Sequence, residues 1–217
     1  MELDFYNVDK KYIAFMQAAE IQKRGFTRIP NMDYEGRKQK FLCGIILTAP
    51  KTSLNYFVGI THYSVQRSEN FLIRVKNDIR PVKGSLRFNY MFPVPLEAVS
   101  KISIAQEADA RYRILLSKEL KAINNDAQII IDKANSVYHK VTNKQCSQNL
   151  LLNSCDFTYL EEKCLEYEKT HGYGQPEKSA KTIEEEDTEV ERTPFNDLLV
   201  KLKAQEKAEH KAEELER

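Results

Sequence analysis

Short runs of β-branched and aromatic residues recur along the first 100 residues, and polar, turn-like stretches such as APKTS and SVQRSEN separate them. Such runs are typical of strands, because branched and aromatic side chains pack well on a pleated surface. Several short strands at this spacing favour a small, mostly antiparallel barrel or strongly bent sheet. The expected strands span residues 2–8, 40–49, 54–61, 71–76 and 86–94.

The apolar residues follow a helical period elsewhere in the chain. A first helix is expected between a cap at Asp9 and an end at Gly25. Residues 104–138 predict two further helices, and another is expected between the cap Asp156 and Gly172. We therefore predict an α+β fold, a small bent antiparallel β-barrel with added helices that cover its open side.

Charge divides the chain into a basic body and an acidic tail. The net charge is only +1, yet residues 1–120 contain 19 Lys and Arg against 12 Asp and Glu. A basic body suits a polyanionic partner such as nucleic acid. The predicted parts are a barrel over 1–100, covering helices over 101–174, and an acidic tail over 175–217. We expect this tail to be a disordered linker followed by a helix capped at Thr193.

Several classes of protein find no support in the sequence. It contains no run of 18 or more apolar residues and no signal-peptide layout near Met1, so we expect a cytoplasmic protein without a membrane partner. The four cysteines form no CxxC pair, which favours reduced thiols over a zinc site or a disulfide framework. The body shows no acidic cluster of the kind that holds two metal ions, so we expect neither a metal nor a cofactor.

An unusual polar sequence ends the predicted strand YFVGIT, where Thr61, His62, Tyr63 and Ser64 follow one another. Cleavage of RNA without a metal needs groups that move protons and groups that stabilise charge on the phosphate. Taken singly, each candidate also has an ordinary explanation, such as a core tyrosine or a solvated lysine. Further candidates of these types lie at the first helix opening and in the basic loop before the second strand: Tyr12, Tyr34, Arg37, Lys38 and Lys40.

Six stretches in this order resemble the toxins of type III toxin-antitoxin systems, the ToxN/AbiQ family. They are FY near the start, KYI at the first helix, KFLCGIIL after a tyrosine-containing loop, YFVGIT, FNYMFPV and RYRILLSKELKAI. The similarity covers roughly residues 3–170.

This resemblance implies a compact bent barrel related to the MazF and Kid toxins, so that residues 1–174 form an RNase domain. It implies a metal-independent endoribonuclease that cuts cellular or phage RNA and leaves a 2′,3′-cyclic phosphate and a 5′-hydroxyl. The implied antitoxin is a small, pseudoknot-like RNA, cut from a repeated precursor and bound in an RNA-bridged hetero-oligomer. The implied role is growth arrest and abortive phage infection.

The resemblance also implies site residues. The tyrosine at the helix opening of the family matches Tyr12, and its loop tyrosine matches Tyr34. The family's lysine matches Lys38 by its spacing from Tyr34, or Lys40 by its spacing to Gly44. We prefer Lys40, because a strand is a more rigid ruler than a loop.

The strand-end motif Thr-Ser-Pro-Lys of the family is replaced here by Thr61, His62, Tyr63 and Ser64. We predict that His62 is a general acid or base, that Lys40 stabilises phosphate charge, and that Thr61 hydrogen-bonds a phosphate oxygen. The predicted RNA-binding residues are Tyr12, Tyr34, Arg37, Lys38, Tyr63 and Ser64.

Two other hypotheses stay open at this point. The basic body could be a noncatalytic RNA-binding module, in which His62 and the lysines only bind phosphate. Alternatively, the acidic tail could organise an interaction scaffold, in which case residues 1–174 alone would have no activity in cells.

Overall fold

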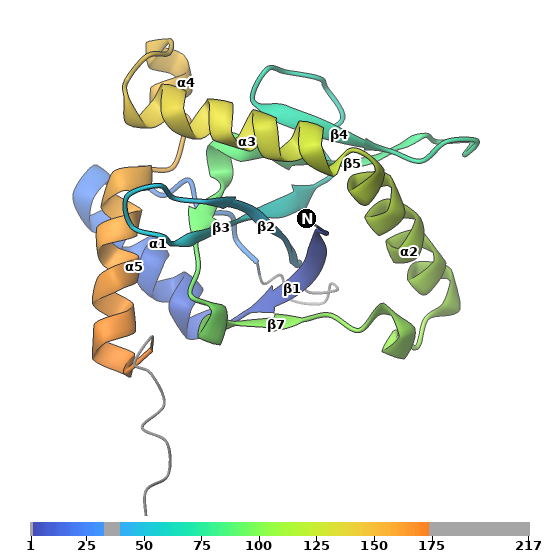
Figure 1. The fold of residues 1–217 in the computed structure, drawn as a ribbon, viewed down its shortest axis with the longest axis horizontal. Coiled ribbons are helices and arrows are strands. Elements are labelled where there is room, and N and C mark those ends of the chain that lie inside the picture. Colours follow the sequence, from blue (N-terminus) through green and yellow to red (C-terminus); the bar gives the residue numbers. More distant parts are fainter. Residues whose placement is uncertain (1, 33–39, 174–217) are drawn as a thin grey trace, which may run out of the picture. The chain divides into compact units, whose positions relative to one another are not determined.

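The computed structural model describes residues 2–32 and 40–173, which form an α+β fold (Figure 1). One antiparallel sheet has the strand order β4-β5-β3-β2-β1-β7, with β6 paired to β3. The strands are β1 Asp4–Val8, β2 Leu42–Thr48, β3 Asn55–Thr61, β4 Asn70–Arg74, β5 Val82–Arg87, β6 Phe92–Pro93 and β7 Val99–Lys101. The helices are α1 Lys10–Arg24, α2 Ala110–Asn125, α3 Ala127–Thr142, α4 Gln148–Leu152 and α5 Phe157–His171.

The sheet is open, which corrects the prediction of a barrel. Its two outer strands, β4 and β7, do not pair with each other among the described residues. The single strand expected over 86–94 is interrupted by a 3₁₀ turn at Phe88–Tyr90, in which Asn89 is buried and donates to the Asn153 carbonyl at 2.6 Å. This turn lets β5 and β6 pair with opposite ends of β3, so the sheet bends without closing.

Helices α1 and α5 begin and end where the local sequence indicates. The Asp9 carboxylate accepts a hydrogen bond from the backbone N–H two residues later at 2.6 Å, and that of Asp156 from the N–H three residues later at 3.3 Å. Gly25 and Gly172 have φ of 76° and 69°, the left-handed conformation that favours glycine at a helix end. These predicted caps and ends are confirmed.

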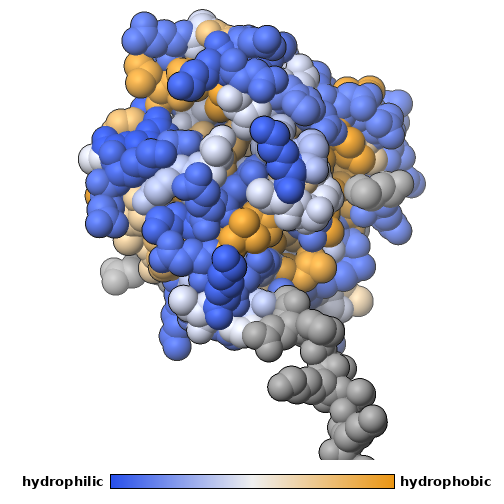
Figure 2. All heavy atoms as spheres, turned by 60° about the vertical axis from the view of Figure 1, so that its left-hand side comes forward, coloured by the Kyte–Doolittle hydropathy of each residue, from blue (hydrophilic) through white to orange (hydrophobic). Residues whose placement is uncertain are grey.

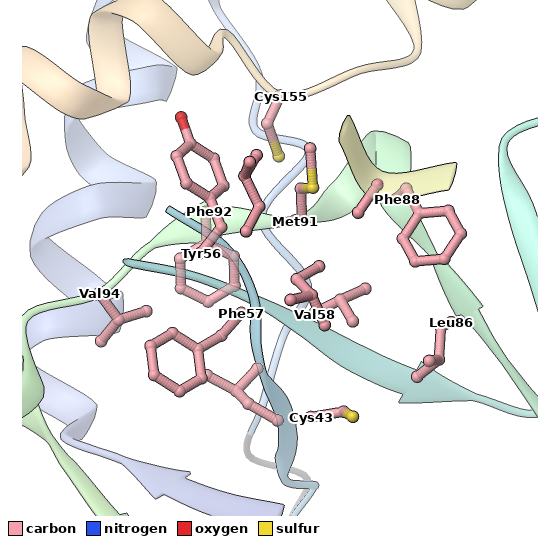
Figure 3. Packing of buried hydrophobic residues seen from close by; sticks show 14 of the residues in the cluster. Cys43, Tyr56, Phe57, Val58, Leu86, Phe88, Met91, Phe92, Val94 and Cys155 are labelled. Atoms are coloured by element: carbon pink, nitrogen blue, oxygen red, sulfur yellow. The ribbon is translucent and has the colours of Figure 1, made fainter. Parts of the chain in front are cut away.

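Aromatic side chains of β3 form the centre of the core (Figure 3). Tyr56, Phe57 and Val58 are each 0% exposed, and burial of such a side chain contributes about 1.5 to 3 kcal/mol. Cys43 and Cys155 also lie in this core as free thiols, and burial raises the pKa of Cys43 to about 12. Such a thiol is inert, because only the thiolate is a good nucleophile.

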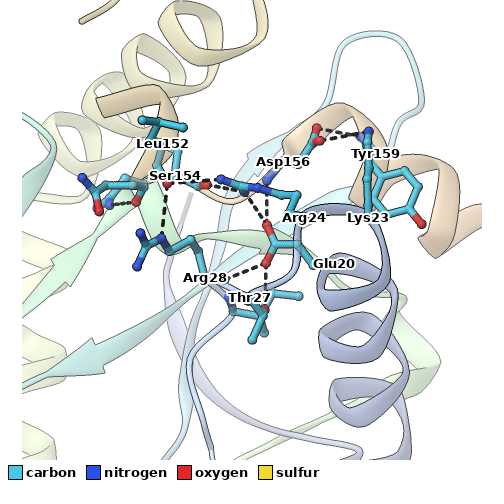
Figure 4. Close-up of polar contacts among 12 residues, drawn as sticks. Glu20, Lys23, Arg24, Thr27, Arg28, Leu152, Ser154, Asp156 and Tyr159 are labelled. Atoms are coloured by element: carbon cyan, nitrogen blue, oxygen red, sulfur yellow. Dashed lines mark hydrogen bonds and ion pairs between the residues drawn. The ribbon is translucent and has the colours of Figure 1, made fainter. Parts of the chain in front are cut away.

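Two buried carboxylates fasten the helices to the rest of the fold. Glu20 of α1 accepts hydrogen bonds from the Arg24 side chain at 2.8 Å, the Thr27 hydroxyl at 2.7 Å, and the backbone N–H groups of Arg28 and Asp156 at 2.7 and 3.0 Å (Figure 4). The second is Glu161 of α5, which accepts from the hydroxyls of Thr52, Tyr56 and Tyr138. Each carboxylate is satisfied entirely by the chain.

The surface on the side of α1, α4 and α5 is mostly hydrophilic, with apolar side chains in small patches (Figure 2). No helix within residues 2–32 and 40–173 is long and apolar enough to cross a membrane. The acidic tail and its predicted helix lie outside the described residues.

Candidate functional site

Two hydroxyl groups meet at the polar end of β3. The register of the sheet pairs Thr61 with Ser85 of β5, and Thr61 Oγ1 lies 3.2 Å from Ser85 Oγ. Ser85 is 0% exposed, whereas Thr61 is half-buried. Directly paired residues place their side chains on the same face of a sheet. The two hydroxyls therefore begin a polar row that crosses the strands.

Lys40 continues this row on the other side of β3. Leu42 of β2 pairs with Gly59, and Cys43 pairs with Val58. Continuing this antiparallel register by two residues places Lys40 opposite Thr61. Since side chains alternate along a strand, Lys40 shares the face of Leu42 and Gly59, which is also the face of Thr61. Lys40 lies two residues before the start of β2, so its position beside the hydroxyl pair is an extension of the register, and its role stays a prediction.

The residues that flank segment 33–39 lie against the same face. The Lys40 backbone N–H donates to the Met32 carbonyl at 3.1 Å. A Cβ placed on Gly59 would lie 3.5 Å from Pro30 Cγ and 4.0 Å from Met32 Sδ. Because Gly59 and Thr61 are two residues apart and share a face, this segment leaves and rejoins the described chain beside the polar row.

Arg87 adds a positive charge near the hydroxyl pair. It lies two residues after Ser85 on β5 and therefore shares its face. The guanidinium carbon lies 4.8 Å from the centroid of the Tyr63 ring and 4.1 Å from that of Tyr90. An arginine can contact aromatic faces and still present the N–H donors at its edge to a phosphate.

Loop 62–69 holds Tyr63 over this arginine. The buried side chain of Asn70 organises the loop: its amide donates to the Val65 carbonyl at 2.9 Å, and its oxygen accepts from the Arg67 backbone at 2.9 Å. The Arg67 side chain in turn donates to the Tyr63 hydroxyl at 2.7 Å. Loop conformation and ring position are therefore fixed by one buried amide.

His62 and Ser64 lie on this loop, and both are exposed. The imidazole of His62 makes no hydrogen bond to another residue of the described part of the chain. The structure therefore places His62 next to Thr61 in sequence and open to a ligand, but it does not join His62 to Lys40 by a contact.

Tyr12 lies in the core and not at the surface. It is 0% exposed, and its hydroxyl donates to the Pro93 carbonyl at 2.7 Å. Its ring contacts Tyr167 of α5 edge-on at 5.0 Å, and burial raises its pKa well above the usual range. A side chain without exposed surface cannot stack on a base in this conformation. We therefore assign Tyr12 a structural role in place of the predicted RNA contact.

Three other predicted RNA-binding residues, Tyr34, Arg37 and Lys38, lie outside the described residues. Ser85 and Arg87 were not among the site residues predicted from the sequence. The signal was available in GSLRF, where a serine and an arginine two residues apart flank a leucine and so share one face of a strand. That face is the one that carries Thr61.

A phosphate set against the row would meet the hydroxyl of Thr61, which contacts the buried Ser85 hydroxyl, with Lys40 and Arg87 predicted on the same face. Hydroxyl, ammonium and guanidinium donors are the groups that stabilise charge developing on phosphoryl oxygens. Within residues 2–32 and 40–173, no three His, Cys, Asp or Glu side chains come together as a possible metal site. The arrangement is therefore suited to binding a phosphodiester.

Comparison with known proteins identifies the family to which this chain is similar. The sequence pattern of the toxin ToxN of type III toxin-antitoxin systems matches residues 4–165. The endoribonuclease ToxN of Bacillus thuringiensis subsp. kurstaki is 28% identical over 174 residues, which cover 76% of this chain and 84% of the relative. The endoribonuclease ToxN of Pectobacterium atrosepticum is 23% identical over 177 residues, covering 77% and 95%.

Solved structures show the same fold. One, from a bacterial type III system whose toxin is inhibited by a non-coding RNA pseudoknot, has a TM-score of 0.67 at 24% identity and covers 78% of this chain and 99% of its own. Another, the lactococcal anti-phage endoribonuclease AbiQ, has a TM-score of 0.64 at 23% identity, with coverage of 78% and 99%. The predicted endoribonuclease family is confirmed. The chain belongs to the ToxN family, the toxins of type III toxin-antitoxin systems.

Proposed function

We propose that this ToxN family member is a metal-independent endoribonuclease that cuts RNA by attack of a ribose 2′-hydroxyl on the adjacent phosphorus. The products are a 2′,3′-cyclic phosphate and a 5′-hydroxyl. The toxin acts in the cytoplasm on cellular or phage RNA, arrests growth, and contributes to abortive infection. Its open, bent sheet is a relative of the MazF and Kid barrels. Family membership and the phosphate-binding geometry of the row support this proposal.

The antitoxin is a repeat-derived, pseudoknot-like small RNA that binds over the same polar row. Toxin and RNA form an RNA-bridged hetero-oligomer. Support comes from the solved structure of similar fold, in which a non-coding RNA pseudoknot inhibits the toxin. A site that contacts phosphates can bind a folded RNA of any base sequence, because every nucleotide carries a phosphate.

The observation that supports the catalytic proposal is the β2–β3 register: extended two residues beyond the pair of Leu42 with Gly59, it would bring Lys40 opposite Thr61. Thr61 donates a hydrogen bond to a nonbridging phosphate oxygen, the buried Ser85 hydroxyl holds Thr61 in position, and Lys40 stabilises the extra negative charge on the phosphorane. His62 reaches the site from its loop and transfers one of the two protons: it takes the proton of the 2′-hydroxyl or gives one to the departing 5′ oxygen. Solvent water exchanges the other proton. Arg87 holds the neighbouring phosphate, while Tyr63, Ser64 and the basic loop residues contact the strand.

Substitution of Lys40 and of His62 tests this assignment. We expect Lys40→Ala and His62→Ala each to slow single-turnover cleavage of bulk messenger RNA by about 10²- to 10⁴-fold, because each removes charge stabilisation or proton transfer. Binding of an uncleavable 2′-O-methyl RNA should weaken much less. Lys51→Ala removes an exposed lysine from the turn between β2 and β3 and is the matched control.

Three outcomes would contradict the proposal. Equal losses of binding and cleavage would favour the noncatalytic RNA-binding module. Loss of cleavage on adding a chelator would contradict metal independence. Products that carry a 3′-hydroxyl would contradict attack by the ribose.

A further inference from the structure

A second concentration of positive charge lies where the end of β4 meets the last turns of α2, beside the β4–β5 hairpin (Figure 1). The two elements enclose a cavity of about 490 Å³. Four cationic side chains line it, together with one amide and one carboxylate: Arg74, Lys76, Lys118, Lys121, Asn125 and Asp126.

The spacing of the lining residues along α2 directs their side chains toward the cavity. Lys118, Lys121 and Asn125 recur at intervals of three and four residues, which places them on one face of α2. Leu116 and Ile123 are buried on the other face and dock the helix against the body. The cationic face is thus held in place by the apolar one.

The cavity keeps its positive charge because the nearby carboxylates are occupied or buried. Asp78 forms an ion pair with Lys83 at 2.6 Å, which lowers the pKa of Asp78. Glu119 is only 6% exposed. Of the residues that the structure describes, Asp126 is the one acidic group in the lining.

The four cations are available to a ligand. Arg74, Lys76, Lys118 and Lys121 are exposed, and none forms an ion pair with another residue in the described part of the chain. Exposed like charges held this close repel one another, and a polyanion relieves that repulsion.

The cavity lies near the polar row. Leu72 of β4 pairs with Ser85, which pairs with Thr61, and Arg74 lies two residues further along β4. With strands spaced about 4.8 Å apart and a rise of about 3.3 Å per residue, the Cα atoms of Thr61 and Arg74 are roughly 12 Å apart. An RNA bound at Thr61 can therefore reach the cavity within a few nucleotides.

We propose that this cavity is a second RNA-binding site, which holds consecutive backbone phosphates of the RNA whose scissile phosphate lies at Thr61. Among the described residues, no aromatic side chain lines the cavity, so they offer no surface on which a base could stack. Binding there is independent of base sequence and strongly dependent on salt. The inference rests on the proposed function only in taking RNA as the ligand.

The double variant Lys118→Ala/Lys121→Ala tests this site, with Lys140→Ala/Lys169→Ala as a control that removes two exposed lysines from α3 and α5. A labelled 2′-O-methyl oligouridylate serves as the probe. We expect its affinity to fall about tenfold in the cavity variant, with the slope of log affinity against log salt reduced by about 1.4 for two lost phosphate contacts. The control should keep the wild-type slope. Equal losses in both variants, or no loss of affinity for either this oligonucleotide or a stable RNA hairpin, would overturn the site.

Further probes separate the sources of phosphate. A loss confined to a stable RNA hairpin assigns the cavity to the folded antitoxin, and a loss confined to the single strand assigns it to the substrate. If inorganic phosphate binds the wild type and not the cavity variant, while the oligonucleotide binds both equally, the cavity binds a single ion and the RNA site is refuted.

The test also keeps this site distinct from the proposed chemistry. The dinucleotide uridylyl-uridine is too short to reach the cavity, so its cleavage should be the same in the cavity variant and the wild type. If the wild type cuts no RNA, the proposed function fails, while the binding comparison still decides the cavity.

Discussion

The polar clusters around Glu20 and around Thr61 differ in what completes them. Glu20 is 0% exposed, and each of its carboxylate oxygens accepts two hydrogen bonds from the chain. Thr61 is half-buried at the end of its strand, with Arg87 and an exposed histidine nearby. A cluster whose acceptors are all satisfied internally holds the fold. One that lies on an open sheet face leaves room for a ligand to complete it.

Two tyrosines repeat this contrast. The hydroxyl of Tyr12 donates to a backbone carbonyl inside the core, whereas Tyr63 lies half-buried over Arg87 and accepts a hydrogen bond from Arg67. A tyrosine side chain can stack on a base, but only that of Tyr63 is partly exposed to solvent and so available to RNA. Burial, not residue type, separates structural from functional candidates here.

Among the variants that test this comparison, a substitution of Glu20 is expected to change stability most. Glu20→Ala removes the acceptor of the Thr27 hydroxyl and of two backbone N–H groups, and it removes the carboxylate that pairs with the Arg24 guanidinium. The free energy of unfolding should therefore fall by about 3 to 5 kcal/mol. Urea denaturation measures this change. Glu162→Ala, at an exposed position of α5, is the control and should stay within about 0.5 kcal/mol. Similar losses in both variants would contradict a structural role for Glu20.

Glu119 is an intermediate case, a buried carboxylate whose pKa burial raises to about 7. The folded protein therefore binds a proton that the unfolded chain releases near pH 4.5, and stability falls as the pH rises through this interval. Glu119→Gln removes the penalty. We expect it to stabilise the protein by about 2 to 3 kcal/mol at pH 8 and hardly at all at pH 4.5.

Thermal denaturation of wild type and Glu119→Gln across this pH range measures the difference. A gain that is the same at both ends of the range would show that packing, and not the proton, is responsible.

The smallest effect compares the two tyrosines. Tyr12→Phe leaves the Pro93 carbonyl without its donor and should cost about 1 kcal/mol of stability, with RNA cleavage unchanged. Tyr63→Phe should leave stability within about 0.5 kcal/mol and weaken RNA binding a few-fold, because it releases Arg67. Slower cleavage in Tyr12→Phe than in Tyr63→Phe would reverse the roles given to these residues.

Features that depend on neighbours in sequence could be predicted. The caps Asp9 and Asp156 and the ends Gly25 and Gly172 follow from backbone hydrogen bonding within one turn. The end of β3 at Thr61 was predicted because a polar sequence follows an apolar run there. These features are readable because each is decided by a few consecutive residues.

Features that depend on distant pairing were predicted poorly. Residues 86–94 have strand-like composition throughout, yet the buried turn at Phe88–Tyr90 divides them, and the barrel does not close. Ser85 was missed because its partner Thr61 is 24 residues away and only the register joins them. The apolar face of α1 likewise could not reveal that Tyr12 meets a carbonyl of β6.

The hydrogen bond from Lys40 to Met32 has a consequence for how such a toxin diversifies. Met32 and Lys40, the residues on either side of positions 33–39, are joined by this backbone hydrogen bond. The Lys40 backbone is therefore anchored by Met32, a residue that precedes the segment. An evolutionary change of side chain at positions 33–39 leaves this anchor in place.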